Sequence, residues 1–337
     1  MAINCKSSVV ATSGFMRDFF QSNGSISLYD RTKRKLLQDM EHIFFESNLY
    51  IYTESPLTED DVWQGLLTEG RGETDFHIGD DFSKMNGALK PKKASKKLLP
   101  STYFFESIIL DTRSKKYFHL DLDTYLTKGL MLRTPIDSDF EVFDKKQDME
   151  AKLAHVRNPS RYIIIRDPHL LMNLDDIHNI SEAAAFWISS LIEFPEGLEH
   201  VLLLGKVMSD QGHKVSEEQC VQFSELLGNR LEQQIPGFRA TVTIAIMPYR
   251  QKGRLESWHG RHIYTSYAHH IIDDSVAVFE NGRVKISNTL TITHQLFSKA
   301  GYQSKMSDRL IETCAFVEKY APNHGSGFAN WMRGWMR

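Results

Sequence analysis

The sequence has few cysteines and no cysteine pair. Cys5, Cys220 and Cys314 are far apart and form no Cys-x-x-Cys motif. This spacing argues against a disulfide framework and against a cysteine zinc site. We therefore expect a reducing, cytoplasmic setting, with no metal and no other cofactor.

Long apolar runs are also missing. No segment approaches the roughly 18 apolar residues that a bilayer span needs. Residues 1–20 (MAINCKSSVVATSGFMRDFF) are too polar for the apolar part of a signal peptide. The sequence therefore predicts no export and no integral membrane association.

Neither sign of charge is in excess. The 337 residues include 40 Lys and Arg and 43 Asp and Glu, for a formal net charge of −3. A polyanion site would therefore have to be a local patch. No Walker loop, GxGxxG, HExxH or GxSxG motif occurs, so the usual nucleotide, zinc-protease and serine-hydrolase interpretations lose their support.

Apolar and aromatic residues are plentiful enough for a sizeable core. They make up 41% of the chain and include 20 Phe, 12 Tyr and 5 Trp, and the length suits one large domain or two ordinary ones. Residues 1–152 read as an α+β module of unknown role, with a helix over 31–47 and a strand over 48–53. Two further strands, 103–110 and 116–122, are expected to be joined by a short polar turn.

The pattern changes from residue 153. Expected strands lie over 162–165, 200–204, 239–246, 262–265, 271–279 and 283–286, and expected helices over 180–193 and 216–234. Ser216 and Gln219 form a variant of the capping box at the start of the second helix. Alternating strands and helices predict an α/β fold with a mixed sheet flanked by helices over 153–325. An aromatic and basic tail follows over 326–337.

Two segments of this second part resemble the phospholipase-D-like superfamily. Residues 161–169 (RYIIIRDPH) are similar to the strand of that family that ends in Asp-Pro. Residues 258–266 (WHGRHIYTS) resemble its degenerate His-Asp-Arg segment. The resemblance covers about residues 155–292 and points to the divergent group that includes the C-terminal domain of the MIT-domain-containing protein and bacterial defence-associated proteins. It implies one half-unit of the phospholipase-D-like fold.

The resemblance also bears on catalysis. Active members bring together two copies of His-x-Lys-x-x-x-x-Asp, in which one His attacks phosphorus and the other protonates the leaving group. Here His259 keeps the nucleophile position, Arg261 replaces Lys and Ser266 replaces Asp. With one altered copy, the resemblance favours a degenerate site. A metal-independent phosphodiesterase or nuclease, completed in a homodimer, is the alternative.

A basic and aromatic segment surrounds this motif. Its cations and histidines fall within thirteen residues, beside Tyr249 and Trp258: Arg250, Lys252, Arg254, His259, Arg261 and His262. Such a loop at the end of a sheet can bind phosphate by charge and stack a base, with Trp258 as the stacking residue and His259 as a polar positioning group. The alternative is an ordinary solvated loop.

Three further features leave alternatives open. Asp167 closes a strand before Pro168, where a carboxylate either orients a site residue such as His259 or caps the following turn. His269 and His270 have metal-capable atoms, but neighbours in a strand point to opposite faces and cannot share one ion without distortion. The tail residues Trp331 and Trp335 are expected to dock on the chain itself, on a partner or at a membrane interface.

These features together predict a non-catalytic subunit that binds nucleic acid or a protein partner. The family resemblance suggests a bacterial anti-phage defence complex. The alternatives are a homodimeric phosphodiesterase or nuclease that uses His259, and a membrane-associated scaffold that depends on Trp331 and Trp335.

Overall fold

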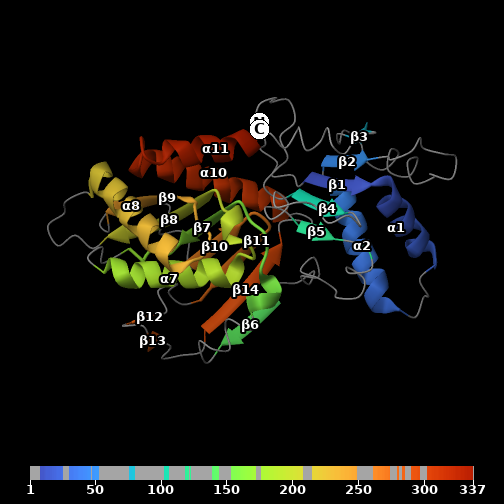
Figure 1. The fold of residues 1–337 in the computed structure, drawn as a ribbon, viewed down its shortest axis with the longest axis horizontal. Helices are drawn as coiled ribbons and strands as arrows, with labels where there is room; N and C mark the ends of the chain where they lie inside the picture. Colours follow the sequence, from blue (N-terminus) through green and yellow to red (C-terminus); the bar gives the residue numbers. More distant parts are fainter. Residues whose placement is uncertain are drawn as a thin grey trace.

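Two sheets with helices packed on them make up the part of the chain that the structure, a computed structural model, describes (Figure 1). The described residues are 8–25, 30–46, 48–52, 76–79, 102–105, 118–120, 122, 139–143, 153–171, 176–207, 215–248, 261–273, 279–280, 283–284, 290–296 and 302–336.

The first sheet is entirely parallel. It has the order β3-β2-β1-β4-β5, and its strands are β1 (Ser8–Thr12), β2 (Asn48–Tyr52), β3 (Phe76–Gly79), β4 (Thr102–Phe105) and β5 (Phe118–Leu120). Between β1 and β2 the chain forms α1 (Ser13–Ser25) and α2 (Arg31–Glu46). The expected helix over 31–47 and strand over 48–53 are confirmed.

Two expectations for this part are wrong. The interpretation as an α+β module fails because every strand pair of the first sheet is parallel and helices connect β1 to β2, which is an α/β arrangement. The expected pair of strands over 103–110 and 116–122 is not a hairpin, because β4 and β5 lie parallel. Parallel neighbours need a crossover connection rather than a tight turn.

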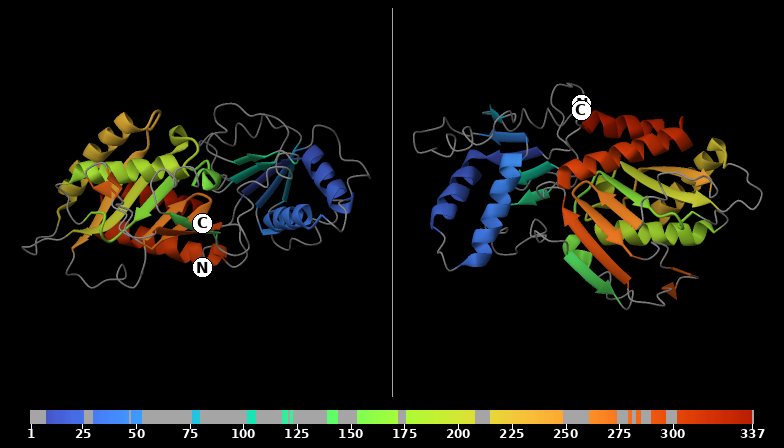
Figure 2. Two further views of the ribbon diagram at one scale, coloured as in Figure 1. Left: turned by 90° about the horizontal axis from the view of Figure 1, so that it is seen from below. Right: turned by 180° about the vertical axis from the view of Figure 1, so that it is seen from behind.

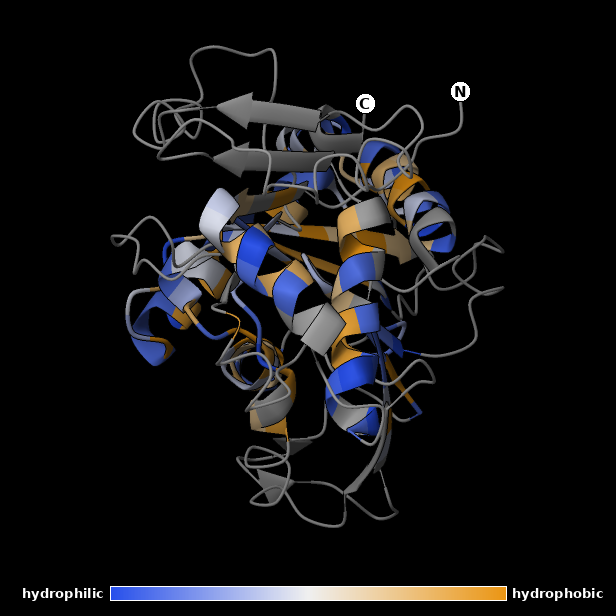
Figure 3. Ribbon diagram, turned by 90° about the vertical axis from the view of Figure 1, so that its right-hand side faces the viewer, coloured by the Kyte–Doolittle hydropathy of each residue, from blue (hydrophilic) through white to orange (hydrophobic). Residues whose placement is uncertain are grey.

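The aromatic residues after β1 build the core of this part. Phe15 and Phe19 of α1 each meet Phe44 of α2 edge to face, with ring centroids 6.4 and 5.1 Å apart. All three side chains are buried. Figure 3 shows blue and orange stretches alternating along the helices, the pattern of one polar and one apolar face.

The second sheet has seven strands in the order β6-β14-β11-β10-β7-β8-β9. Its strands are β6 (Asp139–Phe143), β7 (Tyr162–Arg166), β8 (His200–Val207), β9 (Thr241–Pro248), β10 (Arg261–Thr265), β11 (Ala268–Ile272) and β14 (Leu290–Leu296). β7, β8 and β9 are parallel, and the remaining pairs are antiparallel. The expected α/β fold with a mixed sheet is confirmed, but the sheet also includes β6, which lies before residue 153, where this part was expected to begin. A short ribbon pairs β12 (Phe279–Glu280) with β13 (Arg283–Val284).

Helices lie on both faces of this sheet. α7 (Ile177–Leu191) and α8 (Glu217–Gln234) cover one face, and α10 (Tyr302–Tyr320) and α11 (Ser326–Met336) cover the other (Figure 1). Short 3₁₀ turns occur at Ala154–Val156 and Pro195–Gly197. α8 begins with the predicted capping box, because Ser216 Oγ accepts from the backbone of Gln219 and the Gln219 side chain accepts from that of Ser216.

Alternation along the strands divides the core between the two faces. Ile163 and Ile165 of β7 pack on the α7–α8 side together with Trp187. Tyr162 and Ile164 pack on the α10–α11 side. Because the strands are buried on both faces, they read as continuous apolar runs in the sequence.

The two parts of the chain meet through the turn between β10 and β11. Tyr267 in that turn packs edge to face on Tyr103 of β4, with ring centroids 5.1 Å apart. Both side chains are buried. The blue helices α1 and α2 lie apart from the yellow-to-red second part in both views of Figure 2.

Candidate functional site

The candidate site lies at the edge of the second sheet where the parallel strands end. β7 and β8 finish there, and β10 begins there because it is antiparallel to β7, with His262 opposite Arg166. β9 also ends at this edge, at Pro248. Pro248 and Arg261 therefore lie at the same edge of the sheet. Of the predicted binding residues, Arg250, Lys252, Arg254, Trp258 and His259 lie outside the described residues.

Arg261 and Asp167 face each other at this edge. Arg261 Nε lies 3.9 Å from Asp167 Oδ1, and Arg261 Nη1 donates to the Asp273 carbonyl oxygen at 3.1 Å. Asp167 Oδ1 also accepts from the backbone of His169 at 2.7 Å, so the expected cap of the turn is confirmed. The Asp167 carboxylate is fully buried. It therefore holds the turn after β7 and the start of β10 together.

His262 does not share a face with Arg261. Alternation along β10 sends Arg261 to the α7 side with Ile263, and His262 to the α10 side with Tyr264. The side chains of Arg261 and His262, both predicted to bind, therefore lie on opposite faces of the sheet at the same edge. A ligand that bends around the edge can touch both.

On the α10 side, three rings form a stack. The rings of Tyr264 and His269 are 4.4 Å apart and 14° from parallel, and those of His262 and His269 are 5.0 Å apart. His262 Nδ1 and His269 Nε2 share a hydrogen bond of 2.9 Å. Burial, followed by the charges of His262, Arg309 and Arg166, holds the pKa of His269 well below 6.5.

Arg166 ends β7 beside this stack and is fully buried. Its pKa is lowered to about 9, mainly by burial and also by Arg309, while Tyr264 and Glu312 act to raise it. Burial raises the pKa of Tyr264 to about 12, so its hydroxyl remains a hydrogen-bond donor at neutral pH. Arg309 and Glu312, both from α10, form an ion pair of 3.6 Å. The site therefore combines buried donors with cations of low hydration, an arrangement that can hold an anion.

We name this group the α10-side cluster. Its members come from β7, β10, β11 and α10: Arg166, His262, Tyr264, His269, Arg309 and Glu312. Lys206 lies on the same face of neighbouring β8, two residues beyond Leu204, and its backbone donates to the Pro168 carbonyl at 3.3 Å.

A second histidine pair occupies the opposite face of the sheet. His270 Nδ1 and His294 Nδ1 lie 2.7 Å apart across β11 and β14, and both rings are buried. His269 and His270 therefore point to opposite faces, as expected. Among the described residues, no group of three His, Cys, Asp or Glu side chains is arranged to hold a metal ion.

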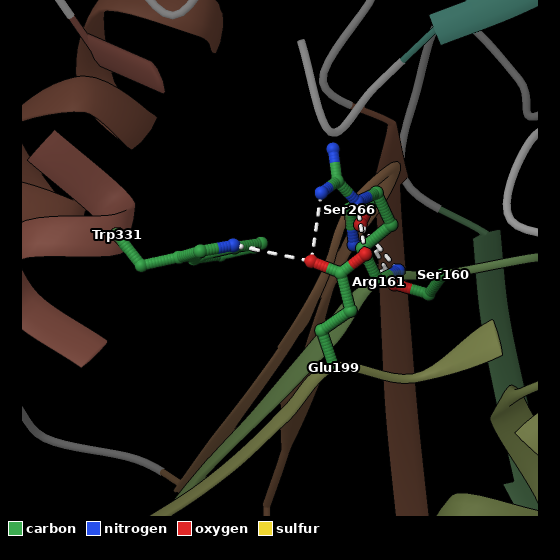
Figure 4. A network of polar contacts seen from close by, with 5 residues as sticks. All are labelled: Ser160, Arg161, Glu199, Ser266 and Trp331. Carbon is green, nitrogen blue, oxygen red and sulfur yellow. Dashed lines mark hydrogen bonds and ion pairs between the residues drawn. The ribbon is translucent and has the colours of Figure 1, made fainter. Parts of the chain in front are cut away.

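Ser266 lies at the other end of β10 from Arg261. Its hydroxyl accepts from the backbone of Arg161 at 3.0 Å and lies 2.9 Å from Ser160 Oγ, and its backbone donates to Ser160 Oγ at 2.7 Å (Figure 4). Ser266 is buried. The position that the family resemblance gives to a carboxylate is therefore a packing position between β7 and the β10–β11 turn.

The tail docks on its own chain through Trp331. Its indole lies tilted by 53° against the ring of His200, with ring centroids 4.6 Å apart, and lies 5.5 Å from the Arg161 guanidinium. Arg161 also forms a bidentate pair with Glu199 (Figure 4). Of the three expected docking surfaces, the structure shows the first for Trp331. The side chain of Trp335 lies outside the described residues.

No protein-family model matches the sequence, and no curated protein matches it. Within the described residues, none of the helices is long and apolar enough to cross a membrane.

Sequence reasoning missed most of the α10-side cluster. Arg166 and Tyr264 were included only as parts of strands, and Arg309 and Glu312 lie in a helix that the pattern did not predict. One signal was available, because Arg166 ends an apolar run in which a charge is costly to bury.

Proposed function

We propose that this chain is a non-catalytic subunit that binds the phosphate backbone of nucleic acid at the edge where β7 and β8 end and β10 begins. One observation supports this most directly. Arg166, Arg261 and Arg309 gather at the edge from β7, β10 and α10. Pro248, the last residue of β9, and Arg261, the first residue of β10, lie at the same edge.

Charge and shape both favour this ligand class. One arginine guanidinium can donate hydrogen bonds to two oxygens of the same phosphate, and it loses less hydration on binding than an ammonium group does. Affinity for a nucleic-acid backbone comes mainly from such contacts. The phospholipase-D-like half-unit, and membership of a bacterial defence complex, belong to this proposal on the strength of the sequence resemblance.

The arrangement of the motif residues argues for binding without catalysis. In the family scheme a carboxylate follows the basic residue of the motif, but here Ser266 is buried among Ser160 and the backbone of Arg161. It lies at the opposite end of β10 from Arg261. A homodimeric phosphodiesterase that uses His259 would have to work without that carboxylate.

Binding and cleavage can be separated in one assay. The purified chain is mixed with labelled single- and double-stranded oligonucleotides in EDTA, over a range of salt concentrations. We expect salt-sensitive binding without cleavage. Arg261→Ala should weaken it by about 10-fold and reduce the salt slope by about 1, whereas His259→Ala should leave it unchanged. Arg230→Ala, on α8, is the matched control.

Two outcomes would overturn the proposal. Cleavage that His259→Ala abolishes would make the chain a phosphodiesterase. Recovery from the source cell of a stoichiometric protein partner, with no nucleic acid bound by the purified chain, would make it a protein-binding subunit. Circular dichroism of Arg261→Ala confirms that the variant is folded.

A further inference from the structure

We propose that the α10-side cluster is a receptor for a phosphate monoester, the terminal phosphate of a nucleic-acid strand. This inference rests on the proposed function and makes it more specific, because it says which phosphate of the strand the cluster binds. The cluster lies on the α10 face of the edge, whereas Arg261 lies on the other face.

The cluster has buried members and solvent-exposed members. Arg166, Tyr264 and His269 are 0%, 1% and 5% exposed, respectively. The side chains of Arg309 and Glu312 are 45% and 29% exposed, so solvent reaches the cluster beside them. An internal phosphodiester continues as a chain in two directions and needs an open groove. A terminal phosphate has the chain on one side only, so it can approach a cluster that is partly buried.

The net charge of the cluster is positive, so it attracts a dianion more strongly than a monoanion. Arg166 and Arg309 supply two positive charges, and the Glu312 carboxylate, paired with Arg309 at 3.6 Å, supplies one negative charge. A monoester carries about −1.5 to −2 near neutral pH, and an internal diester carries less.

The cluster also offers donors for several oxygens of one group. The Tyr264 hydroxyl is buried and makes no hydrogen bond with any residue in the described part of the chain. Arg166 and Arg309 act electrostatically on the same phenol. His262 and His269 both lie in ring contact with Tyr264. A phosphate monoester has three terminal oxygens, and a diester has two free ones.

The test compares ends that differ only in phosphate. One labelled single strand is prepared with a 5′-phosphate, with a 3′-phosphate and with hydroxyls at both ends. We expect one phosphorylated form to bind at least about 10-fold more tightly than the hydroxyl form. Arg309→Gln should remove this preference, because it should weaken binding of the phosphorylated form much more than binding of the hydroxyl form. Lys319→Gln, at the far end of α10, should retain the preference.

Arg166→Gln provides a second test, of the buried part of the cluster. If Arg166→Gln does not fold, Arg309→Gln still tests the cluster, because the side chain of Arg309 is exposed. Inorganic phosphate is the third probe, with thermal stabilisation as its readout. We expect it to stabilise the unaltered chain and not Arg309→Gln.

The outcomes separate this inference from the proposed function. Equal binding of all three strands overturns the monoester receptor and leaves the proposed function standing. Stabilisation by inorganic phosphate that depends on Arg309, with no strand bound, overturns both the strand-end receptor and the proposed function, and leaves a site for free phosphate. No response to any probe overturns both.

Discussion

Trp331 donates a hydrogen bond from its indole Nε1 to Glu199 Oε2 at 3.1 Å, and so ties α11 to the residue that precedes β8. Arg161 binds the same carboxylate from the residue that precedes β7. One carboxylate therefore joins the start of two central strands to the last described helix.

Removing the indole should destabilise the chain in two stages. Trp331→Phe keeps an aromatic ring near His200 but loses the hydrogen bond, and should cost about 1 kcal/mol. Trp331→Ala also loses the ring contacts and should cost about 3 kcal/mol. Urea unfolding measures both. The control is Asn330→Ala, on the exposed side of α11, which should change the stability by less than about 0.5 kcal/mol. If Trp331→Ala destabilised the chain no more than Asn330→Ala does, the docking of Trp331 would be contradicted.

Two glycines at the start of α11 should respond in opposite ways to alanine. A Cβ on Gly325 would lie 2.0 Å from Val317 Cγ1 and 2.7 Å from the Ala321 carbonyl oxygen. Since backbone must move, Gly325→Ala should cost about 2–3 kcal/mol. A Cβ on Gly327 meets nothing within 4 Å, so Gly327→Ala should be neutral or stabilise by up to about 1 kcal/mol. Melting temperatures of the two variants test the close packing of α10 on α11.

Restoring the carboxylate of the family motif should harm the fold rather than create an enzyme. Ser266→Asp places a charge in a buried site beside Ser160, which should cost several kcal/mol, about 3 or more. Ser189→Asp, on the exposed side of α7, is the control and should cost little. A stable Ser266→Asp variant that cleaves oligonucleotides would refute this account of the β10–β11 turn.

Acid should weaken the fold through the buried histidines of β11. Burial holds the pKa values of His269 and His270 well below 6.5. The folded chain therefore binds fewer protons than the unfolded chain below about pH 6.5. Stability should be full above that pH and fall as the pH drops, by up to about 1.4 kcal/mol per pH unit for each histidine.

Urea unfolding from about pH 5 to pH 8 measures this slope. His270→Asn should flatten it, and His178→Asn, an exposed position on α7, should not. An unchanged slope in His270→Asn would show that the pair with His294 does not control the acid response.

The sequence predicted those elements whose signal is local. Each of these signals depends on residues that are close together in the sequence. Examples are the apolar face of α2, the capping residues Ser216 and Gln219 of α8, and the buried apolar run of β7. The parallel pairing of β4 with β5 was missed, because strand direction depends on a crossover and not on the strands themselves.

The candidate site shows the same limit. The turn cap by Asp167 could be predicted because its acceptor and donor lie two residues apart. The electrostatic interaction between Arg166 and Arg309 could not be predicted. The two residues come from distant segments, and the sequence did not predict that α10 packs on the sheet.

The pairing of β6 with β14 has a consequence for how the chain folds. Asp139–Phe143 is the first strand of the second sheet in chain order, and its neighbour, Leu290–Leu296, is the last. During synthesis, β6 cannot pair fully with β14 until residue 296 has left the ribosome. Non-local pairings of this kind slow folding, because the chain loses entropy when the loop closes, before the contacts that compensate for this loss have formed. The outer strand of the second sheet is therefore completed late, after β7, β8 and β9 have emerged.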